Sequence, residues 1–307
     1  MRIAVLGAGA MGSWIGGHLA LSGNDVCLLT TNNEHINAVR ENGLILKHGQ
    51  RVDTVQLPIG KPDEFNDEVH LIIVLTKTFQ LKTALSSISN TLTSKTAVLS
   101  LQNGLGNSEV ISEFVSAENI WIGMTMLPVD REAPGIVVGK GVGGTWFGNA
   151  QGGINPLGKT LEAAFTKSGI QVKYDPEIVK RIWQKVAFNA GMNAVCALTH
   201  STPGTINRSP FALKLVKAVA KEVAQVAKAE SVEVDLASVF NTIEYACEHH
   251  GAHIPSMLRD LLQGRQTEVD ALNGAIASRA EATGTQAPLN HQLAGLIKLA
   301  EMGHREV

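Results

Sequence analysis

The chain has 307 residues, of which 44% are hydrophobic and 18% are charged, and its formal net charge is -2. This length suggests about two domains with ordinary hydrophobic cores. The near-neutral charge gives no global attraction to nucleic acid, and no apolar run reaches the roughly 18 residues expected of a membrane-spanning helix. The composition therefore favours small-molecule chemistry, with no nucleic acid and no membrane as partner.

Cysteine usage and the first residues indicate the compartment. Cys27, Cys196 and Cys247 are widely separated, so neither a disulfide framework nor a cysteine zinc site is expected. Glycines interrupt the apolar run after Arg2 within a few residues, which is not typical of a secretion signal. We therefore expect a cytoplasmic protein.

The chain opens with MRIAVLGAGAMGSW, a short apolar run followed by glycines spaced G-x-G-x-x-G. A strand, a tight turn and a helix over Met11 to Leu21 are expected, with the glycines at Gly7, Gly9 and Gly12. In such a unit a pyrophosphate meets the backbone N–H groups at the helix start. The same pattern also occurs in turns that bind nothing, but its place between a strand and a helix favours a nucleotide.

Short apolar strands alternate with helical segments through residue 175. The alternation predicts a doubly wound, mostly parallel sheet, a Rossmann domain over residues 1–175. The glycine-rich stretch after Pro134 is interpreted as hairpins added to the sheet edge. Long helical patterns predict an all-α domain over residues 176–307. The expected strands are Ile3 to Leu6, Asp25 to Leu29, His70 to Leu75, Ala97 to Leu101 and Trp121 to Met124.

Ligands of open parallel sheets bind beyond the carboxyl ends of the strands. Lys77 and Asn103 follow two of the expected strands, so both are candidates for the site. The alternatives are a solvated loop lysine and a turn residue ahead of a glycine. After the second strand, Thr31 stands where an acidic residue would indicate NAD or an arginine NADP. Because a neutral side chain would not repel a phosphate, NADP is favoured and NAD stays possible.

A polar stripe marks the first helix of the second domain. Lys185, Asn189 and Asn193 are four residues apart, which places them on one side of an otherwise apolar helix. They are interpreted as a substrate cradle with Lys185 as proton donor. The alternative is a pair of core asparagines bonded to backbone carbonyls beside a surface lysine.

Two later residues have both functional and structural interpretations. Ser256 follows a proline and would also suit a helix cap, and Glu268 would also complement a helix dipole. His249, His250 and His253 lie together at a helix end, but no carboxylate set with ligand geometry accompanies them, so no metal site is expected.

Several motifs in the same order resemble the ketopantoate reductase family over nearly the whole chain. They are GAGAMG, the strand-end Lys77, QNGLGN, the pair Pro134 and Gly135, the helix with K-x-x-x-N-x-x-x-N, and SMLRDLLQGRQTEVDALNG. The resemblance implies a Rossmann domain, a helical domain, and NADPH-dependent reduction of 2-dehydropantoate to (R)-pantoate in pantothenate synthesis. This sequence departs from the family at Thr31, where studied bacterial members place an arginine, and near Pro203, where a substrate-side asparagine has no equivalent.

The resemblance also implies roles for individual residues. Lys185 corresponds to the general acid, and Glu268 lies at the cofactor and the substrate hydroxyl. The substrate-binding positions are Asn103, Asn189, Asn193 and Ser256. The cofactor-binding positions are Gly7, Ala8, Gly9, Ala10, Met11, Gly12, Thr31, Lys77, Asn103 and Glu268.

The mechanism expected from these residues is hydride transfer to the ketone of a 2-oxo acid, with Lys185 protonating the developing alkoxide. Two rivals stay open. One is an NAD-preferring 2-hydroxyacid dehydrogenase of the same superfamily, and the other is a nucleotide-sensing protein without catalysis. The apolar helical domain is compatible with a homodimer, but the same helices also suit its own core.

Overall fold

The computed structural model describes residues 1–141 and 143–306. Unit 1 comprises Met1–Gln102 and Asn107–Ile178, and unit 2 comprises Asn103–Gly106 and the chain from Val179 onward. The loop Asn103–Gly106 therefore interrupts unit 1 in the sequence but packs with unit 2.

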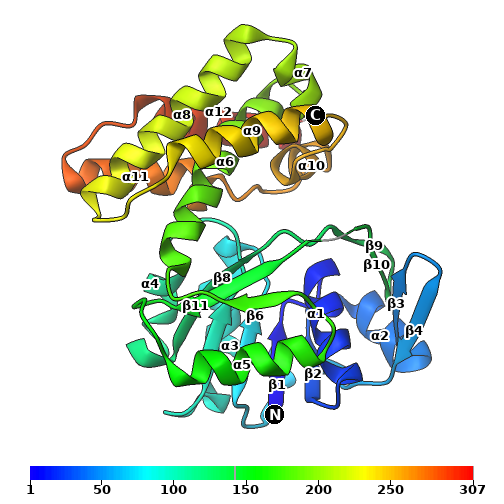
Figure 1. Ribbon diagram of the computed structural model, residues 1–307. Helices are drawn as coiled ribbons and strands as arrows, with labels where there is room; N and C mark the ends of the chain where they lie inside the picture. Colours follow the sequence, from blue (N-terminus) through cyan, green and yellow to red (C-terminus); the bar gives the residue numbers. More distant parts are fainter. Residues whose placement is uncertain (142, 307) are drawn as a thin grey trace. The chain divides into compact units, whose positions relative to one another are not determined.

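Unit 1 is built on an eight-stranded sheet (Figure 1). Neighbouring strands pair in parallel except β8 and β11, which are antiparallel. The expected Rossmann sheet is thereby confirmed, together with its five expected strands, which are β1, β2, β6, β7 and β8. The strands in spatial order are β12 (Val172–Tyr174), β11 (Thr145–Asn149), β8 (Ile120–Thr125), β7 (Ala97–Ser100), β6 (Leu71–Val74), β1 (Arg2–Leu6), β2 (Asp25–Leu29) and β5 (Ile59–Gly60).

Helices cover both faces of this sheet, because successive side chains of a strand point to opposite faces. In β1, Ile3 and Val5 pack with α1 and α5, whereas Ala4 and Leu6 pack with α3 and α4. The helices are α1 (Ala10–Leu21), α2 (Asn33–Asn42), α3 (Leu81–Ser87), α4 (Asn107–Ile111) and α5 (Pro156–Lys167). Single 3-10 turns are η1 (Pro62–Glu64), η2 (Thr78–Gln80), η3 (Ser89–Thr91) and η4 (Ala117–Asn119).

A second, four-stranded sheet corrects one expectation. The glycine-rich stretch after Pro134 does not form hairpins at the edge of the main sheet. Its first strand pairs instead in the small sheet, and only β11 joins the large one. Residues far apart in sequence build the small sheet, which explains why local pattern did not reveal it. Its order is β4 (Arg51–Val55), β3 (Leu44–His48), β10 (Ile136–Gly139) and β9 (Val129–Ala133).

Unit 2 is entirely helical in its described part, as expected. One core of buried Val, Ile, Leu, Ala and Met side chains lies between its helices. The described residues include no helix with the length and hydropathy needed to cross a bilayer. The helices are α6 (Ile178–Leu198), α7 (Pro203–Asn207), α8 (Pro210–Ala229), α9 (Leu236–His249), α10 (Ser256–Leu262), α11 (Asn273–Thr283) and α12 (Pro288–Glu306), with the 3-10 turn η5 (Val269–Ala271).

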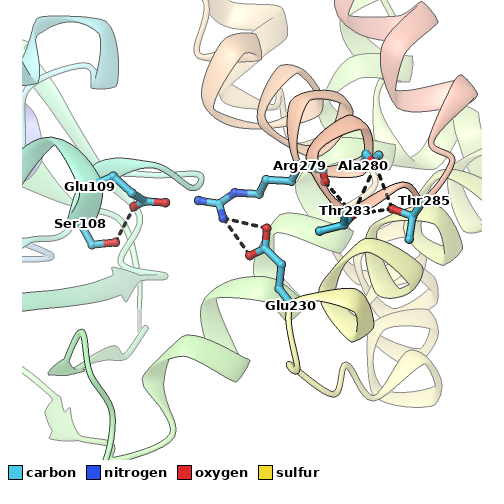
Figure 2. Close-up of polar contacts among 7 residues, drawn as sticks. All are labelled: Ser108, Glu109, Glu230, Arg279, Ala280, Thr283 and Thr285. Carbon is cyan, nitrogen blue, oxygen red and sulfur yellow. Dashed lines mark hydrogen bonds and ion pairs between the residues drawn. The ribbon is translucent and has the colours of Figure 1, made fainter.

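Polar contacts fix the helices of unit 2 to one another. Arg279 of α11 donates to both carboxylate oxygens of Glu230, at 3.0 and 2.8 Å, and so joins α11 to the end of α8 (Figure 2). The Arg279 guanidinium also lies 6.0 Å from the centre of the Trp183 ring on α6. Nearby, Glu222 of α8 accepts the backbone N–H groups of Leu289 and Asn290, both at 3.0 Å, at the start of α12.

Candidate active site

A hydrogen-bonded triad of Lys185, Asn103 and Glu268 lies within unit 2. Lys185 belongs to α6, Asn103 to the loop after β7, and Glu268 immediately precedes η5. The Lys185 ammonium donates to Asn103 Oδ1 at 2.9 Å, and Asn103 Nδ2 donates to Glu268 Oε2 at 3.2 Å. One amide therefore connects three segments that are distant in sequence.

The Asn103 amide can satisfy both neighbours in only one orientation. An ammonium group only donates hydrogen bonds, and an ionised carboxylate only accepts them. The amide oxygen must therefore face Lys185 and the amide nitrogen Glu268, as observed. Asn103 thus couples a cationic and an anionic side chain and is more than a turn residue.

Backbone contacts hold Asn103 close to Glu268. The N–H of Leu105 donates to the carbonyl oxygen of Ala271 at 2.8 Å. Gly104 has a φ of +82°, and a Cβ at this position would overlap the Ala271 carbonyl. The glycine in QNGLGN therefore permits the close approach that fastens the Asn103 loop beside the Glu268 segment.

Side chains that the sequence interpretation did not select hold the segment before Glu268. The Thr267 N–H donates to Glu301 Oε1 of α12 at 2.8 Å. Arg265 donates through Nε and Nη2 to Asp260 Oδ1, at 3.1 and 2.9 Å, and Asp260 is 3% exposed. The charged pair was visible within SMLRDLLQGRQTEVDALNG, but no local pattern identifies Glu301 as a partner.

Burial gives Lys185 the acidity of a proton donor. It lowers the pKa of Lys185 from 10.5 to about 8, and the negative charge of Glu268 opposes part of this shift. A pKa near the working pH is the condition under which a general acid is most effective. The alternative of a solvated surface lysine is wrong, because the side chain is partly buried and hydrogen-bonded.

Asn189 and Asn193 are mostly buried on α6, with 9% and 7% of their surfaces exposed. Within the described chain, neither side chain forms a hydrogen bond. The alternative that these amides bond to backbone carbonyls of the core is therefore wrong. Neither amide is among the fully buried side-chain groups that lack a partner in the described residues, so both keep some solvent access and are suited to receive a ligand.

Ser256 is the exposed first residue of α10. Pro255 occupies the N-cap, and no side chain of the described residues caps this helix. The helix-cap interpretation of Ser256 is therefore not supported. Glu268 occupies the N-cap position of η5, which is compatible with the dipole interpretation, and its carboxylate also accepts a hydrogen bond from Asn103.

The glycine loop of unit 1 has the features of a dinucleotide site. A Cβ at Gly7, where φ is +102°, would overlap the backbone of Thr76, and one at Gly12 would overlap the Gly7 carbonyl. Gly9 is different, because its φ of -77° suits any residue and no atom of another described segment lies within 4 Å of a built Cβ. The space beside Gly9 is therefore open, as it is at the second glycine of a dinucleotide loop, where the pyrophosphate approaches the backbone.

The rest of the loop fits the same ligand. Gly7 and Ala8 donate their N–H groups to the Leu29 carbonyl of β2, at 2.9 and 3.0 Å. Ala10 and Met11 open α1, and no side chain in the described part of the chain caps this helix. The first N–H groups of a helix have no intrahelical partner, so they can bind phosphate oxygens.

The ends of neighbouring strands β6 and β7 are joined by a residue not selected from sequence. The Gln102 side chain donates to the Thr76 carbonyl and hydroxyl oxygens, at 2.9 and 3.0 Å. This contact links Thr76, which directly precedes Lys77, to Gln102, which directly precedes Asn103. Lys77 is partly buried at the start of η2, and Thr31 is exposed after β2.

The described residues hold no cluster of three or more histidine, cysteine, aspartate or glutamate side chains that could bind a metal ion. The His249 ring contacts the Tyr245 ring in a tilted arrangement, with ring centres 4.4 Å apart and an interplanar angle of 40°.

Comparisons with known proteins agree with this geometry. Residues 3–152 match the family described as ketopantoate reductase PanE/ApbA, and residues 177–301 match the C-terminal part of that family. The chain is 35% identical over 302 residues to a 2-dehydropantoate 2-reductase from Streptococcus pyogenes serotype M6, covering 98% of each chain.

Two solved structures have the same fold. One is a ternary structure of D-mandelate dehydrogenase with NADH and anilino(oxo)acetate, 34% identical, with a TM-score of 0.94 over 99% of this chain and 100% of that one. The other is a PanE/ApbA family ketopantoate reductase from Ralstonia eutropha JMP134, 26% identical, with a TM-score of 0.91 over the same shares. The resemblance inferred from sequence is confirmed: this chain is an oxidoreductase that belongs to the ketopantoate reductase PanE/ApbA family.

Proposed function

We propose that this chain reduces 2-dehydropantoate to (R)-pantoate, with NADPH as the hydride source and Lys185 as the proton source. The observation that carries the proposal is the triad of Lys185, Asn103 and Glu268 in a chain of this family. The relative from Streptococcus pyogenes, named 2-dehydropantoate 2-reductase, supports the choice of substrate.

The glycine loop of unit 1 would hold the cofactor, which supplies the hydride when bound. Lys77 would add a positive charge near the phosphates, and Thr31 would lie beside the adenosine ribose. The loop residues assigned to the pyrophosphate are Gly7, Ala8, Gly9, Ala10, Met11 and Gly12.

Lys185 would complete the reduction. Addition of hydride to the ketone carbon leaves negative charge on its oxygen. The ammonium gives a proton to that oxygen, the hydroxyl forms, and the neutral amine regains its proton from solvent. General acid catalysis of this kind typically contributes about 10²–10⁴-fold, and the pKa of about 8 keeps Lys185 mostly protonated at neutral pH.

Asn103 and Glu268 would support this proton transfer. The Asn103 amide oxygen holds the ammonium in one direction, which would orient it for proton transfer to the substrate. The Glu268 charge raises the Lys185 pKa against the effect of burial. The same carboxylate would accept the distal hydroxyl of the substrate and share in the cofactor contacts.

Asn189, Asn193 and Ser256 would bind the 2-oxo acid. The two amides are mostly buried and have no hydrogen-bond partner in the described chain, so donation to a substrate carboxylate would satisfy them. Such contacts would orient the ketone for hydride transfer.

A second candidate is NAD-dependent reduction of a 2-oxo acid with another side chain. The D-mandelate dehydrogenase with NADH matches with a TM-score of 0.94. Thr31 offers no positive charge to the 2'-phosphate of NADP, and Glu34 places an exposed carboxylate in the first turn of α2. These observations support NADH as the alternative cofactor, although the neutral Thr31 would not repel the phosphate of NADP, and the curated relatives favour 2-dehydropantoate as substrate.

Initial rates decide between the candidates. The purified chain is assayed with 2-dehydropantoate and with phenylglyoxylate, each at matched NADPH and NADH concentrations. The proposal predicts the highest kcat/KM for 2-dehydropantoate with NADPH. A higher value for phenylglyoxylate with NADH would establish the second candidate, and no turnover of either acid would overturn both.

A further inference from the structure

One fully buried histidine in unit 1 has no part in the proposed reaction. His35 lies in the first turn of α2 and is 0% exposed. The Gly135 N–H donates to its Nδ1 at 2.9 Å, and its Nε2 lies 3.0 Å from Ser13 Oγ. The imidazole therefore bridges the turn between β9 and β10, 100 residues further along the chain, and the helix after the glycine loop.

The partners of His35 determine its tautomer. A backbone N–H can only donate, so Nδ1 must carry no proton. In the neutral ring the proton is then on Nε2, which donates to Ser13 Oγ. The Ser13 hydroxyl in turn donates to the Ala8 carbonyl at 3.3 Å. One directed chain of hydrogen bonds thus runs from Gly135 through His35 and Ser13 to Ala8.

This chain ends on the loop assigned to the cofactor. Ala8 lies between Gly7 and Gly9, and the Ser13 N–H donates to the Gly9 carbonyl at 3.0 Å. Ser13 therefore holds two consecutive carbonyl groups of the loop, one through its side chain and one through its backbone. The direction of these peptide groups sets where the loop presents its N–H groups.

The contact with His35 also gives a structural reason for the glycine of the pair Pro134 and Gly135, which has no role in the proposed reaction. Gly135 has a φ of +77°, and a built Cβ would lie 3.1 Å from the Ala38 Cβ of α2. Glycine thus lets the turn approach α2 closely enough for its N–H to reach the imidazole. The backbone N–H of His35 donates to Oδ1 of Asn32 at 2.8 Å, and Asn32 directly follows Thr31 in the sequence.

We propose that His35 is a positioning residue for the dinucleotide: through Ser13 it fixes the carbonyl of Ala8, and through Gly135 it holds the β9–β10 turn against α2. The inference rests on the proposed use of the glycine loop for a nicotinamide cofactor. It concerns cofactor affinity and not the proton transfer at Lys185.

Equilibrium binding of NADPH and NADH tests the proposal without turnover. His35→Leu removes both ring contacts, and Ser13→Ala removes only the bond to Ala8. We expect both variants to raise the cofactor Kd, by about tenfold in His35→Leu, the size of effect typical of one lost hydrogen bond. The KM for cofactor should rise with it, while kcat and the KM for the 2-oxo acid stay unchanged.

His70→Leu is a matched control. His70 is exposed in the same unit, and its Nδ1 also accepts a backbone N–H, that of Arg2, at 3.2 Å. This variant should bind cofactor as the wild type does. His35→Gln should restore part of the affinity, because its amide can accept from Gly135 and donate to Ser13.

Nuclear magnetic resonance of the labelled ring provides a second readout, and we expect the proton on Nε2. An unchanged cofactor Kd in folded Ser13→Ala and His35→Leu, or a proton on Nδ1, would overturn the inference. If the Kd values rise as expected but no 2-oxo acid is reduced, the inference stands and the proposed function fails.

Discussion

Replacing Glu268 by Gln should move the pH dependence of the reduction to lower pH. The carboxylate charge is lost, but the amide oxygen of the new side chain can still accept from Asn103. Two hydrogen bonds in series, of 2.9 and 3.2 Å, separate the Lys185 and Glu268 charges. At roughly 7 Å and an effective dielectric of about 20, their attraction is about 2 kcal/mol, which solvent and salt reduce.

That attraction corresponds to a fall of about one unit in the Lys185 pKa. Reduction requires the protonated lysine, so its rate declines as pH rises through the pKa. The alkaline limb of kcat/KM should therefore move from about 8 in the wild type to about one unit lower in Glu268→Gln. At pH 8 the protonated fraction then falls about fivefold, while near pH 6 it barely changes.

The assay is kcat/KM for the 2-oxo acid between pH 5.5 and about 10 at saturating cofactor. The rate at the acid plateau reports separately on any lost contact to the substrate. Asp270→Asn is the control, since Asp270 lies on the same segment but pairs with Lys298 at 2.6 Å, where both side chains are exposed. The electrostatic coupling would be refuted if kcat/KM declined at the same alkaline pH in Glu268→Gln and the wild type. It would also be refuted if Asp270→Asn lowered that pH as much as Glu268→Gln does.

Three further variants test other parts of the account. Asn189→Leu removes an amide proposed to bind the substrate, so it should raise the KM for the 2-oxo acid and lower kcat/KM about 10- to 100-fold. The KM for the cofactor should not change. The melting temperature should not fall either, because the Asn189 amide has no partner among the described residues. Gln102→Leu should lower kcat/KM about tenfold and the melting temperature by a few degrees, because the contacts with Thr76 are lost. Glu222→Gln should cost about 1–3 kcal/mol in urea unfolding, because it weakens the bonds to the N–H groups that start α12; an unchanged midpoint would contradict this.

Local hydrophobic pattern was sufficient to predict the mostly parallel sheet of unit 1 and five of its strands. Runs such as LIIV and AVLS are buried on both faces, and such continuous apolar runs are typical of parallel strands. The glycine spacing after β1 predicted a tight loop. In the structure, a Cβ at Gly7 or Gly12 of this loop would overlap backbone atoms. Strand ends and helix spacing also singled out Lys185, Asn103 and Glu268 one by one, but only the family resemblance implied that they act together.

Long-range partners could not be predicted from the sequence. Glu301 binds the Thr267 backbone 34 residues away, and Gly135 binds His35 across 100 residues. Neither pair leaves a periodic signal, because a backbone N–H can donate to any suitably placed acceptor. In the same way, β10 was expected at the edge of the main sheet but pairs in the small one, because alternation identifies a strand but not its neighbour.

The most direct test of the central claim is the rate of hydride transfer in Lys185→Ala, measured beside its cofactor Kd. The account predicts a fall in kcat of about 10²–10⁴-fold, loss of the alkaline limb near pH 8, and an unchanged Kd for NADPH and NADH. A variant that reduces the 2-oxo acid as fast as the wild type would contradict the assignment of Lys185 as proton donor.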